Sequence, residues 1–492
     1  MPASPRSRPQ SAQHLEVQRV KVAIVGYGMA GARIARELGR RGVDVTVFGA
    51  ESAAAYNRIL LSSMIAGKQT EAEIALPVPP DHVELRLGEA VEHVDLDAKT
   101  VNGIEFDKLV LATGAEAFVP PIPGLDPLPT GAYVLRTIED ARSILDEAAN
   151  RASAVVLGGG LLGLESARGL AKRGMDVTVV HAAGHLMDRQ LDPLGAKVLA
   201  DSYAEVGVAS ITDARTTRVV HGDDGLTLVL ADGRTVTGQL LVVSCGIRPN
   251  IELAQAMGLE TGRGVVIDDQ CRTSHPDVFA VGDCAEHRGI AYGLVGPAWE
   301  QADVVVDLLS DLNPDAAYEG SRLVTRLKAS GIELAAMGDV EGDEVVSFAD
   351  PARGTYARLV IDEEGRLAGA VMLGDNPMVG QVVQLFDTGD PVPHDRRTLL
   401  MGRPGESVSV APETPASMPD EVVVCRCNNV TKRELRTAFF DGARTPEALS
   451  DATQASTGCG TCTEDVAGLC KWLNSTVAGI GSAAEQLDEV SA

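Results

Sequence analysis

The stretch VAIVGYGMAGARIARELGRRGVDVTVF, residues 22–48, decides the fold. It opens with a short apolar run at 22–25, which breaks into the turn GYGMAG at 26–31. A helical pattern follows over 32–40, and a second strand-like run occupies 43–48. Strand, glycine-rich turn, helix and strand in this order are typical of a βαβ unit with parallel strands. The sequence therefore predicts an α/β fold.

The same pattern recurs over residues 154–180. An apolar run at 154–157 leads into the turn GGGLLG at 158–163, and a helical pattern at 164–173 precedes a strand-like run at 176–180. One such glycine motif is weak evidence because glycine is common, but each copy here follows a strand and opens a helix. We therefore predict an α/β protein with two Rossmann-like dinucleotide-binding domains of three layers.

Each glycine of a G-x-G-x-x-G motif has its own purpose. The first permits a tight turn, the second lets the backbone approach a pyrophosphate, and the third lets the helix pack on the strand. The start of the helix then offers free N–H groups and a positive dipole end to the phosphates. The candidate nucleotide-binding glycines are Gly26, Gly28 and Gly31 in the first motif and Gly158, Gly160 and Gly163 in the second.

The residue at the end of the second strand of each unit helps to select the nucleotide. An acidic residue about 20 residues past the motif usually binds the ribose 2′-OH. In the first unit the nearest candidate is Glu51, slightly later than expected. In the second unit the corresponding residue is His181, with no acid beside it. The sequence therefore leaves NADH and NADPH open, and His181 fits either a 2′-phosphate contact or an exposed strand end.

The remaining segments define the domain organisation. Strands predicted at 108–113, 239–246 and 278–282 indicate that the first unit is interrupted by the second and resumed after it. Residues 402–420 are rich in Pro, Ser and Gly, which is typical of a linker. The predicted order is a disordered tail at 1–20, a first nucleotide domain at 21–145 and 240–317, a second at 146–239, a small α+β domain at 318–400, a linker at 401–420, a small helical cysteine domain at 421–475 and a tail at 476–492.

The composition narrows the classes of partner. The formal net charge of −26 argues against nucleic acid, because binding it requires a basic face. No apolar run approaches the roughly 18–20 residues that span a bilayer, and the N-terminal segment lacks the apolar core of a secretory signal. We therefore expect a cytoplasmic protein that binds neither nucleic acid nor membrane.

Four of the eight cysteines lie between residues 425 and 462, as C-x-C followed by C-x2-C. In a reducing cytosol such a group indicates a metal site rather than disulfides. Four thiolates suit a [2Fe-2S] cluster or zinc, and we favour the cluster because C-x-C is tight for two ligands of one tetrahedral zinc. The predicted ligands are Cys425, Cys427, Cys459 and Cys462. Small buried apolar residues are the expected role of the others, Cys245, Cys271, Cys284 and Cys470.

Two further segments carry a resemblance to a known class. LATG at 111–114 is similar to the "ATG" segment of flavoprotein reductases with two dinucleotide-binding domains. TSHPDVFAVGD at 273–283 is similar to the second FAD motif of the same class. This glutathione-reductase-like class includes rubredoxin reductase and the FAD-binding part of the large subunit of NAD(P)H nitrite reductase. The resemblance covers roughly residues 20–385.

Other segments narrow the resemblance. Those at 55–62, 136–140, 185–192 and 246–250 resemble the branch that assimilates nitrite and nitrate. The sequence CRCNNVTKREL from residue 425, with STGCGTC at 456–462, resembles the bacterioferritin-associated-ferredoxin-like [2Fe-2S] domain. The resemblance thus implies FAD, NADH or NADPH, and a [2Fe-2S] cluster as cofactors.

The resemblance also implies individual roles. Asp283 is expected to hydrogen-bond the ribityl chain of FAD. Glu165 is expected near the nicotinamide, although an ordinary first-turn acid favoured by the helix dipole is an equal alternative. The implied FAD-binding residues are Gly26, Gly28, Gly31, Glu51, Arg58, Thr113, Gly114 and Asp283. The implied NAD(P)H-binding residues are Gly158, Gly160, Gly163, Glu165 and His181.

The electrons also need an exit from FAD. Many relatives use a redox-active disulfide after the first βαβ unit, but this sequence has no cysteine before Cys245. The cysteine domain is therefore the expected exit, and the resemblance implies a separate assimilatory nitrate or nitrite reductase catalytic subunit as partner. A complete nitrite reductase needs further cysteines for sirohaem and a [4Fe-4S] centre, so we expect no nitrite reduction by this chain alone.

Three alternatives stay open. One is a reductase for a rubredoxin, ferredoxin or hydroxylase component, and another is a redox-sensing flavoprotein without dedicated turnover. The third is an amine or opine oxidase. The second glycine motif speaks against such an oxidase, because direct oxidation of a substrate by flavin needs no second nucleotide site.

Overall fold

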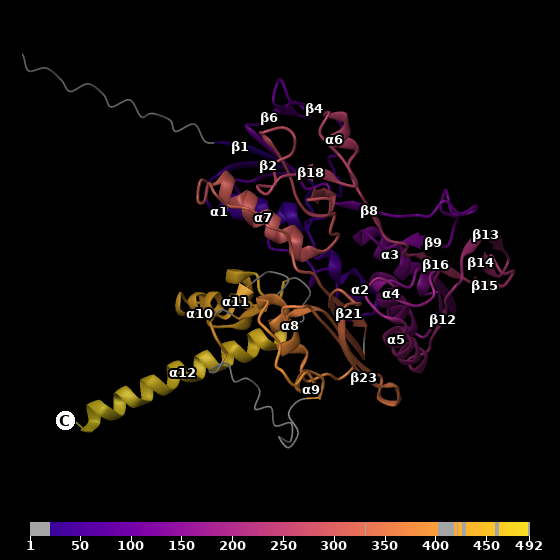
Figure 1. Ribbon diagram of the computed structural model, residues 1–492. Helices are drawn as coiled ribbons and strands as arrows, with labels where there is room; N and C mark the ends of the chain where they lie inside the picture. Colours follow the sequence, from indigo (N-terminus) through magenta and orange to yellow (C-terminus); the bar gives the residue numbers. More distant parts are fainter. Residues whose placement is uncertain are drawn as a thin grey trace, which may run out of the picture.

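The computed structural model (Figure 1) describes residues 20–329, 331–401, 418–420, 422–425, 430–457 and 462–490, apart from the side chains of 328 and 478–490. Two five-stranded parallel sheets and a five-stranded antiparallel sheet make up the body, and a mostly helical part follows near the C-terminus. Within the described ranges, no helix has the length and apolar character needed to cross a membrane.

The first parallel sheet carries the first glycine motif. Its strand order is β19-β7-β1-β2-β3, and all neighbours are parallel. Its strands are β1 (Lys21–Val25), β2 (Asp44–Gly49), β3 (Glu84–Leu87), β7 (Lys108–Leu111) and β19 (Val278–Ala280). Strand β19 follows the second unit in the sequence. The first sheet therefore contains strands from both sides of that unit. Helices α1 (Met29–Arg40) and α7 (Val295–Leu309) lie side by side and share the core of this sheet.

The second parallel sheet has the order β12-β11-β10-β16-β9. Its strands are β9 (Ala132–Val134), β10 (Ser153–Leu157), β11 (Asp176–Val180), β12 (Val208–Ile211) and β16 (Leu240–Val243). Its helices are α3 (Ile138–Ala148), α4 (Leu161–Lys172) and α5 (Pro193–Glu205). Because β9 and β16 both belong to it, this sheet extends past the expected limits of 146–239 on both sides.

Both helices begin earlier than the sequence predicts. Helices are expected from residues 32 and 164, but α1 begins at Met29 and α4 at Leu161. Gly28 and Gly160 are the N-caps, with extended backbone angles. The first helical turn, with its free N–H groups, therefore lies inside each glycine motif, where a phosphate can reach it.

The strands expected at 108–113, 239–246 and 278–282 end earlier, at Leu111, Val243 and Ala280. After β7 and β19 the chain leaves the carboxyl edge of the first sheet, and residues 112–117 and 281–283 line a cavity there. Loops at this edge are where open α/β sheets bind ligands. The shortened strands therefore supply binding loops.

A third sheet follows, with the antiparallel order β21-β22-β25-β24-β23. Its strands are β21 (Val324–Ala329), β22 (Ile332–Gly338), β23 (Glu344–Asp350), β24 (Thr355–Ile361) and β25 (Leu367–Leu373), with helices α8 (Val379–Thr388) and α9 (Arg397–Met401) following. Smaller pairings are made by β8 (Ala115–Ala117) with β17 (Ile247–Pro249), and by β13 (Thr216–Gly222), β14 (Gly225–Leu230) and β15 (Thr235–Gly238).

The C-terminal part, called here the cysteine module, begins with a short hairpin and ends with a long helix. Its elements are β26 (Val423–Cys425), β27 (Val430–Thr431), α10 (Lys432–Phe440), α11 (Pro446–Thr453) and α12 (Thr463–Val490). Thr431 and Glu434 form a capping box that starts α10. In Figure 1, α10 and α11 lie below α1 and α7, and α12 projects away from the body.

Candidate functional site

A cavity of about 1020 Å³ lies at the carboxyl edge of the first sheet and reaches the start of α4. Four parts of the chain line it: the first nucleotide unit, residues 161, 162 and 165 of the second unit, residues 321–326 and 387 of the antiparallel domain, and Val423 of the cysteine module. Of the eight residues expected to bind FAD, the cavity is lined by seven, namely Gly26, Gly28, Glu51, Arg58, Thr113, Gly114 and Asp283. The walls of the two nucleotide units thus meet in one space.

The glycines of the first motif face different surroundings. A Cβ on Gly26 would overlap the carbonyl oxygen of Ala112, and one on Gly31 would overlap the carbonyl oxygen of Gly26. Gly28 faces open space, where Nη2 of Arg58, 4.0 Å from a built Cβ, is the nearest atom. The outer two glycines therefore serve packing, while Gly28 leaves room for a pyrophosphate at the start of α1. This part of the cavity fits the phosphates of FAD.

Glu51 is held in a polar network at the end of β2. The guanidinium of Arg58 donates to Glu51 Oε1 at 2.6 Å, and the Tyr56 hydroxyl donates to Glu51 Oε2 at 2.6 Å. Arg58 also donates to the carbonyl oxygen of Arg136 at 2.7 Å. Burial raises the pKa of Tyr56 well above its usual range, so this phenol stays a donor. The network fixes the carboxylate at the position expected to bind the ribose.

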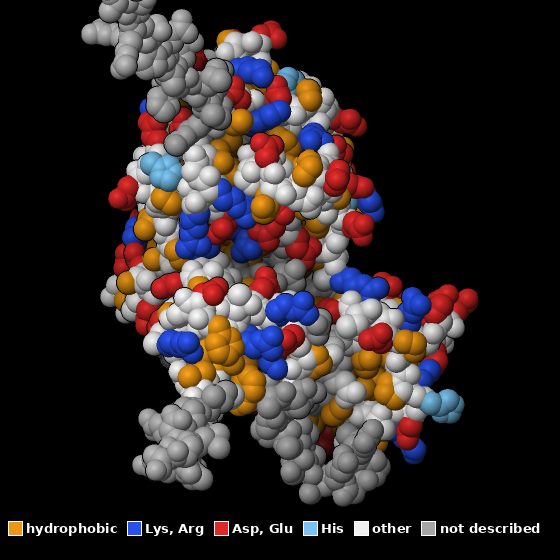
Figure 2. All heavy atoms as spheres, turned by 90° about the vertical axis from the view of Figure 1, so that its left-hand side faces the viewer, with side chains coloured by type: hydrophobic (Ala, Val, Ile, Leu, Met, Phe, Trp, Pro, Cys, Tyr) orange, Lys and Arg blue, Asp and Glu red, His pale blue; other side chains and the backbone are white. Residues whose placement is uncertain are grey.

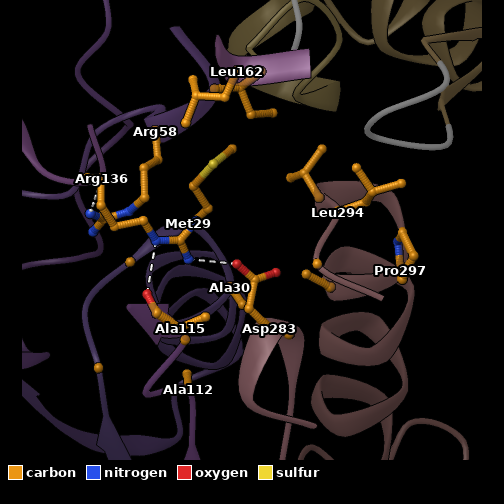
Figure 3. Close-up of a pocket in the computed structure, with 18 of the residues that line it drawn as sticks. Met29, Ala30, Arg58, Ala112, Ala115, Arg136, Leu162, Asp283, Leu294 and Pro297 are labelled. Carbon is orange, nitrogen blue, oxygen red and sulfur yellow. Dashed lines mark hydrogen bonds and ion pairs between the residues drawn. The ribbon is translucent and has the colours of Figure 1, made fainter. Parts of the chain in front are cut away.

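Asp283 and Arg136 form an ion pair on the cavity wall (Figure 3). Arg136 Nη2 donates to Asp283 Oδ2 at 2.6 Å, and Arg136 Nε donates to the carbonyl oxygen of Ala115 at 2.8 Å. Both side chains are about four-fifths buried, with exposures of 21% and 18%. A charge-assisted pair at this depth holds the Asp283 carboxylate in one orientation.

Two distant motifs of the sequence meet beside this pair. Thr113 Oγ1 donates to the carbonyl oxygen of Asn250 at 3.0 Å, and Asn250 Nδ2 donates to the carbonyl oxygen of Thr113 at 2.8 Å. The backbone N–H of Asn250 donates to Gly114 at 3.0 Å. These bonds tie the loop after β17 to the loop after β7, so Asn250 holds the Thr113–Gly114 segment in the cavity wall.

The second glycine motif repeats the arrangement of the first. A Cβ on Gly158 would overlap the carbonyl oxygen of Ser244, and one on Gly163 would overlap the carbonyl oxygen of Gly158. A Cβ on Gly160 would meet no atom within 4 Å. The open space at the start of α4 therefore fits a second pyrophosphate.

His181 holds the second glycine turn. Its Nδ1 accepts from the backbone N–H of Gly159 at 3.0 Å, and its Nε2 lies 3.1 Å from Asp188 Oδ1. Only 14% of the side chain is exposed. The alternative of an exposed strand-end residue is therefore wrong, because the ring is mostly buried and hydrogen-bonds the backbone of the glycine turn.

Glu165 joins the two nucleotide units. It lines the cavity, is 7% exposed, and accepts at 2.7 Å from the hydroxyl of Ser62 in α2 (Leu61–Ile65). It lies in the second turn of α4, whose first turn has no acidic residue. The alternative of an ordinary first-turn acid is therefore wrong. The Ser62 hydrogen bond instead aims a buried carboxylate at the cavity.

Cys425 and Cys462 lie together in the core of the cysteine module, at 0% and 4% exposure. A hydrogen bond with Cys425, together with burial, raises the pKa of the Cys462 thiol. Among the described residues, no third potential metal ligand joins them. Cys427 and Cys459 lie outside the described residues. The outermost two of the four predicted ligands thus meet, as a thiolate-bound cluster requires.

Of the other cysteines, Cys470 shares the module core with Cys425 and Cys462, and the remaining three lie elsewhere. Cys271, Cys284 and Cys470 are buried, at 0%, 0% and 2% exposure, as the sequence predicts. Cys245 is only half-buried, and its burial raises the thiol pKa to about 11. A thiol with a raised pKa is a poor nucleophile at neutral pH.

The sequence also matches known protein families. The family described as pyridine nucleotide-disulphide oxidoreductase matches residues 20–304. The chain belongs to this family. Residues 324–384 match the rubredoxin NAD+ reductase C-terminal domain, and residues 423–471 match the BFD-like [2Fe-2S] binding domain. The resemblance stated from the sequence is thereby confirmed, as is the fold class.

Similar proteins include two from Bacillus subtilis. An NAD(P)H nitrite reductase is 34% identical over 458 residues, 90% of this chain and 56% of that protein. An assimilatory nitrate reductase electron transfer subunit is 32% identical over 486 residues, 94% of this chain and 60% of that protein. The chain spans little more than half the length of either. Among solved structures, putidaredoxin reductase in covalent complex with putidaredoxin has a TM-score of 0.70 and 27% identity, covering 77% of this chain and 95% of that one.

Several residues that the structure places at the site were missed by the sequence analysis. Arg136, Tyr56, Ser62 and Asn250 lie in segments that carried the resemblance, but none was assigned a role. Each acts through a partner at least five residues away in the chain, and often more than a hundred. A buried polar partner at that separation leaves no local pattern to read.

Proposed function

We propose that this chain takes hydride from NAD(P)H onto FAD and passes electrons through a [2Fe-2S] cluster to a protein acceptor. FAD, when bound, supplies the change from two-electron to one-electron chemistry. The observation that carries the proposal is the shared cavity. It is lined by the first glycine motif, by the start of α4 behind the second motif, and by Val423 of the cysteine module.

The residues of the first unit bind FAD in this proposal. Gly28 admits the pyrophosphate to the start of α1, where free N–H groups and the helix dipole favour negative charge. Glu51 accepts from the ribose hydroxyls while Arg58 holds it. Asp283, oriented by Arg136, accepts from the ribityl hydroxyls.

The residues of the second unit bind NAD(P)H. Gly160 admits the second pyrophosphate to the start of α4, and His181 keeps the turn in place. Glu165, held by Ser62, points into the cavity beside the expected nicotinamide position. A buried carboxylate there orients the ring amide by accepting its N–H.

The cysteine module holds the cluster through Cys425, Cys427, Cys459 and Cys462. Support comes from the meeting of Cys425 and Cys462 and from the BFD-like match. As partner we propose an assimilatory nitrate or nitrite reductase catalytic subunit, since the similar proteins carry these names. The second candidate acceptor is a small ferredoxin or rubredoxin, because putidaredoxin reductase has the same fold at 27% identity.

A spectral titration with NADH and then NADPH tests the first half of the relay. We expect bleaching of flavin absorbance followed by bleaching of the cluster, and about two iron atoms per chain. Colourless protein, or zinc in place of iron, would contradict the proposal. Turnover with purified nitrate reductase, ferredoxin and rubredoxin then ranks the acceptors.

Cys459→Ser tests the second half. Loss of one thiolate ligand should abolish reduction of the partner, while NAD(P)H still reduces bound FAD at the original rate. Cys470→Ala, which removes a buried thiol outside the C-x-C and C-x2-C pairs, is the matched control and should keep both activities. Partner reduction that survives Cys459→Ser would show that electrons leave the flavin by another route.

A further inference from the structure

The flavin cavity and the core of the cysteine module share two side chains. Met29, the first residue of α1, and Val295, the first residue of α7, both line the cavity. Both also pack against the hydrophobic cluster that contains Cys425 and Cys462. These two side chains therefore lie between the cavity and the hydrophobic core of the module. Figure 3 shows Met29 reaching into the cavity, with the faint yellow ribbon of the module above it.

Trp299 extends this contact into the module. It lies one helical turn after Val295 on the same face of α7 and is 4% exposed within the module core. Arg33 of α1 stacks on its ring, with the guanidinium carbon 5.4 Å from the ring centre. Arg33 is itself fixed to Asp303 of α7 by an ion pair of 2.7 Å. The indole is therefore held between α1, α7 and the hydrophobic core of the module.

Asn57 fixes a second point of the contact. Its side chain is 1% exposed, and Nδ2 donates to the carbonyl oxygen of Thr457 at 2.5 Å. Its Oδ1 accepts from the backbone N–H of Ile59 at 3.1 Å. Arg58 and Ile59, the next two residues, line the cavity, and Thr457 stands two positions before Cys459. One buried amide thus ties the cavity wall to the chain that carries a predicted cluster ligand.

A charged groove of about 830 Å³ borders the contact. Arg36 and Arg40 of α1 line one side, and Arg433, Glu434 and Asp441 of the module line the other. On the face seen in Figure 2, basic and acidic side chains lie side by side where the upper and lower parts of the molecule meet. An apolar centre with a polar, hydrated rim is the anatomy of a specific interface.

We propose that the cysteine module stays docked at this contact, called here the seat, and does not swing as an arm on the preceding linker. Asn57 and Trp299 are its positioning residues. The inference rests on the proposed function and adds to it the contact that holds the module against the cavity wall. The family matches at 20–304 and 423–471 assign no contact between the two parts. A module held at this contact would place a cluster on its cysteines beside the wall of the flavin cavity.

The test uses the full chain with both cofactors and compares Asn57→Asp with the unaltered protein. Aspartate keeps an oxygen for the Ile59 N–H but loses the donor to Thr457 and places a carboxylate against its carbonyl. Loss of one buried hydrogen bond should lower the ratio of docked to undocked module about tenfold. Flavin reduction by NADH should be unchanged in stopped-flow absorbance, while the following reduction of the cluster should slow by up to the same factor.

A second readout follows docking without turnover. The chain has two tryptophans, so Trp472→Phe leaves Trp299 as the single reporter. In that background Asn57→Asp should shift the emission to longer wavelength and increase acrylamide quenching several-fold. Asn150→Asp, which adds the same charge after α3, is the matched control and should change neither readout. If Asn57→Asp fails to fold, Asn57→Ser keeps an acceptor for Ile59 but is too short to reach Thr457.

The proposal would be overturned if Asn57→Asp left the shielding of Trp299 from acrylamide unchanged. It would also be overturned if quenching increased while the rate of cluster reduction stayed the same. Failure of the proposed function looks different, because the unaltered protein itself would then lack flavin reduction by NADH or lack the cluster spectrum.

Discussion

At the scale of single residues, neighbouring glycines of one motif have different roles, some in packing and others in leaving room for a ligand. Gly26 and Gly31 are required by the protein itself, since any side chain there would overlap backbone oxygen atoms. Gly28 and Gly160 border open space and have negative φ, so an alanine fits both. What such an alanine would disturb is the ligand and not the fold.

Gly28→Ala and Gly160→Ala therefore separate the two nucleotides. The free energy of unfolding of both variants should lie within about 0.5 kcal/mol of that of the unaltered protein. Gly28→Ala should weaken FAD binding about tenfold or more, because a methyl group displaces the pyrophosphate from the start of α1. Gly160→Ala should retain FAD and raise the KM for NAD(P)H. Flavin content and steady-state kinetics measure the two effects, and an exchange of phenotypes would reverse the assignment.

Asp277 provides a residue with a defined dependence on pH. Hydrogen bonds from Lys108 and Lys99 lower its pKa from 3.8 to about 2. The folded-state pKa is the lower one, so its stabilisation is present above about pH 4 and is lost as pH falls toward 2. Asp277→Asn should cost about 1 kcal/mol at pH 7, since the group is partly exposed and solvent screens it. Urea unfolding at pH 7 and pH 3 should show this difference shrinking; a constant difference would contradict the ion pair.

At the scale of elements, helix α2 is fitted closely onto α4. Gly169 of α4 faces α2, and a Cβ there would lie 3.1 Å from the backbone nitrogen of Ala66 and from Cγ2 of Ile65. The same two helices carry Ser62 and Glu165. The absence of a side chain at Gly169 therefore sets the spacing that brings the hydroxyl to the carboxylate.

Gly169→Leu should separate the helices and destabilise the protein by about 1–3 kcal/mol through overpacking. Thermal unfolding measures the loss, and a raised KM for NAD(P)H should accompany it because Glu165 loses Ser62. Gly380→Ala in α8, where a Cβ meets no atom within 4 Å, is the control and should be neutral or stabilising by about 0.5–1 kcal/mol. Equal melting temperatures for the two variants would refute the packing argument.

At the scale of the whole molecule, the chain has one interlocked body and one separable part. A single hydrophobic cluster joins Leu60 of the first unit, Val156 of the second unit and Leu334 and Tyr356 of the antiparallel sheet. The cysteine module has its own cluster, which reaches the body through Trp299, Met29 and Val295. A module of this size rarely supplies enough buried apolar area to fold without a metal or disulfide.

Removing iron with a chelator should therefore unfold the module while the body keeps FAD. We expect a separate low-temperature transition in calorimetry, increased quenching of both tryptophans, and an unchanged flavin spectrum. If the iron-free protein melts in one transition at the original temperature, the cluster does not hold the module together.

The sequence by itself determined the two βαβ units and the cysteine motif. These are local patterns, in which apolar period, glycine spacing and C-x-C spacing all lie within some thirty residues. Gly28 and Gly160 could be chosen as candidates for the same reason, while Asp283 was implied by the resemblance of residues 273–283 to a known FAD motif. The predicted ends of helices and strands were less accurate, as at Met29 and Leu161, because helix ends fray and no periodic pattern marks the terminal turn.

Only the tertiary structure decided which partners those residues have. Arg136 with Asp283, Ser62 with Glu165 and Asn57 with Thr457 are separated by 147, 103 and 400 positions. Each pair is brought together by the packing of whole elements, and the burial that makes a hydrogen bond selective exists only after that packing. No short window of sequence contains both members of such a pair, so the seat of the cysteine module against the cavity is a property of the folded chain.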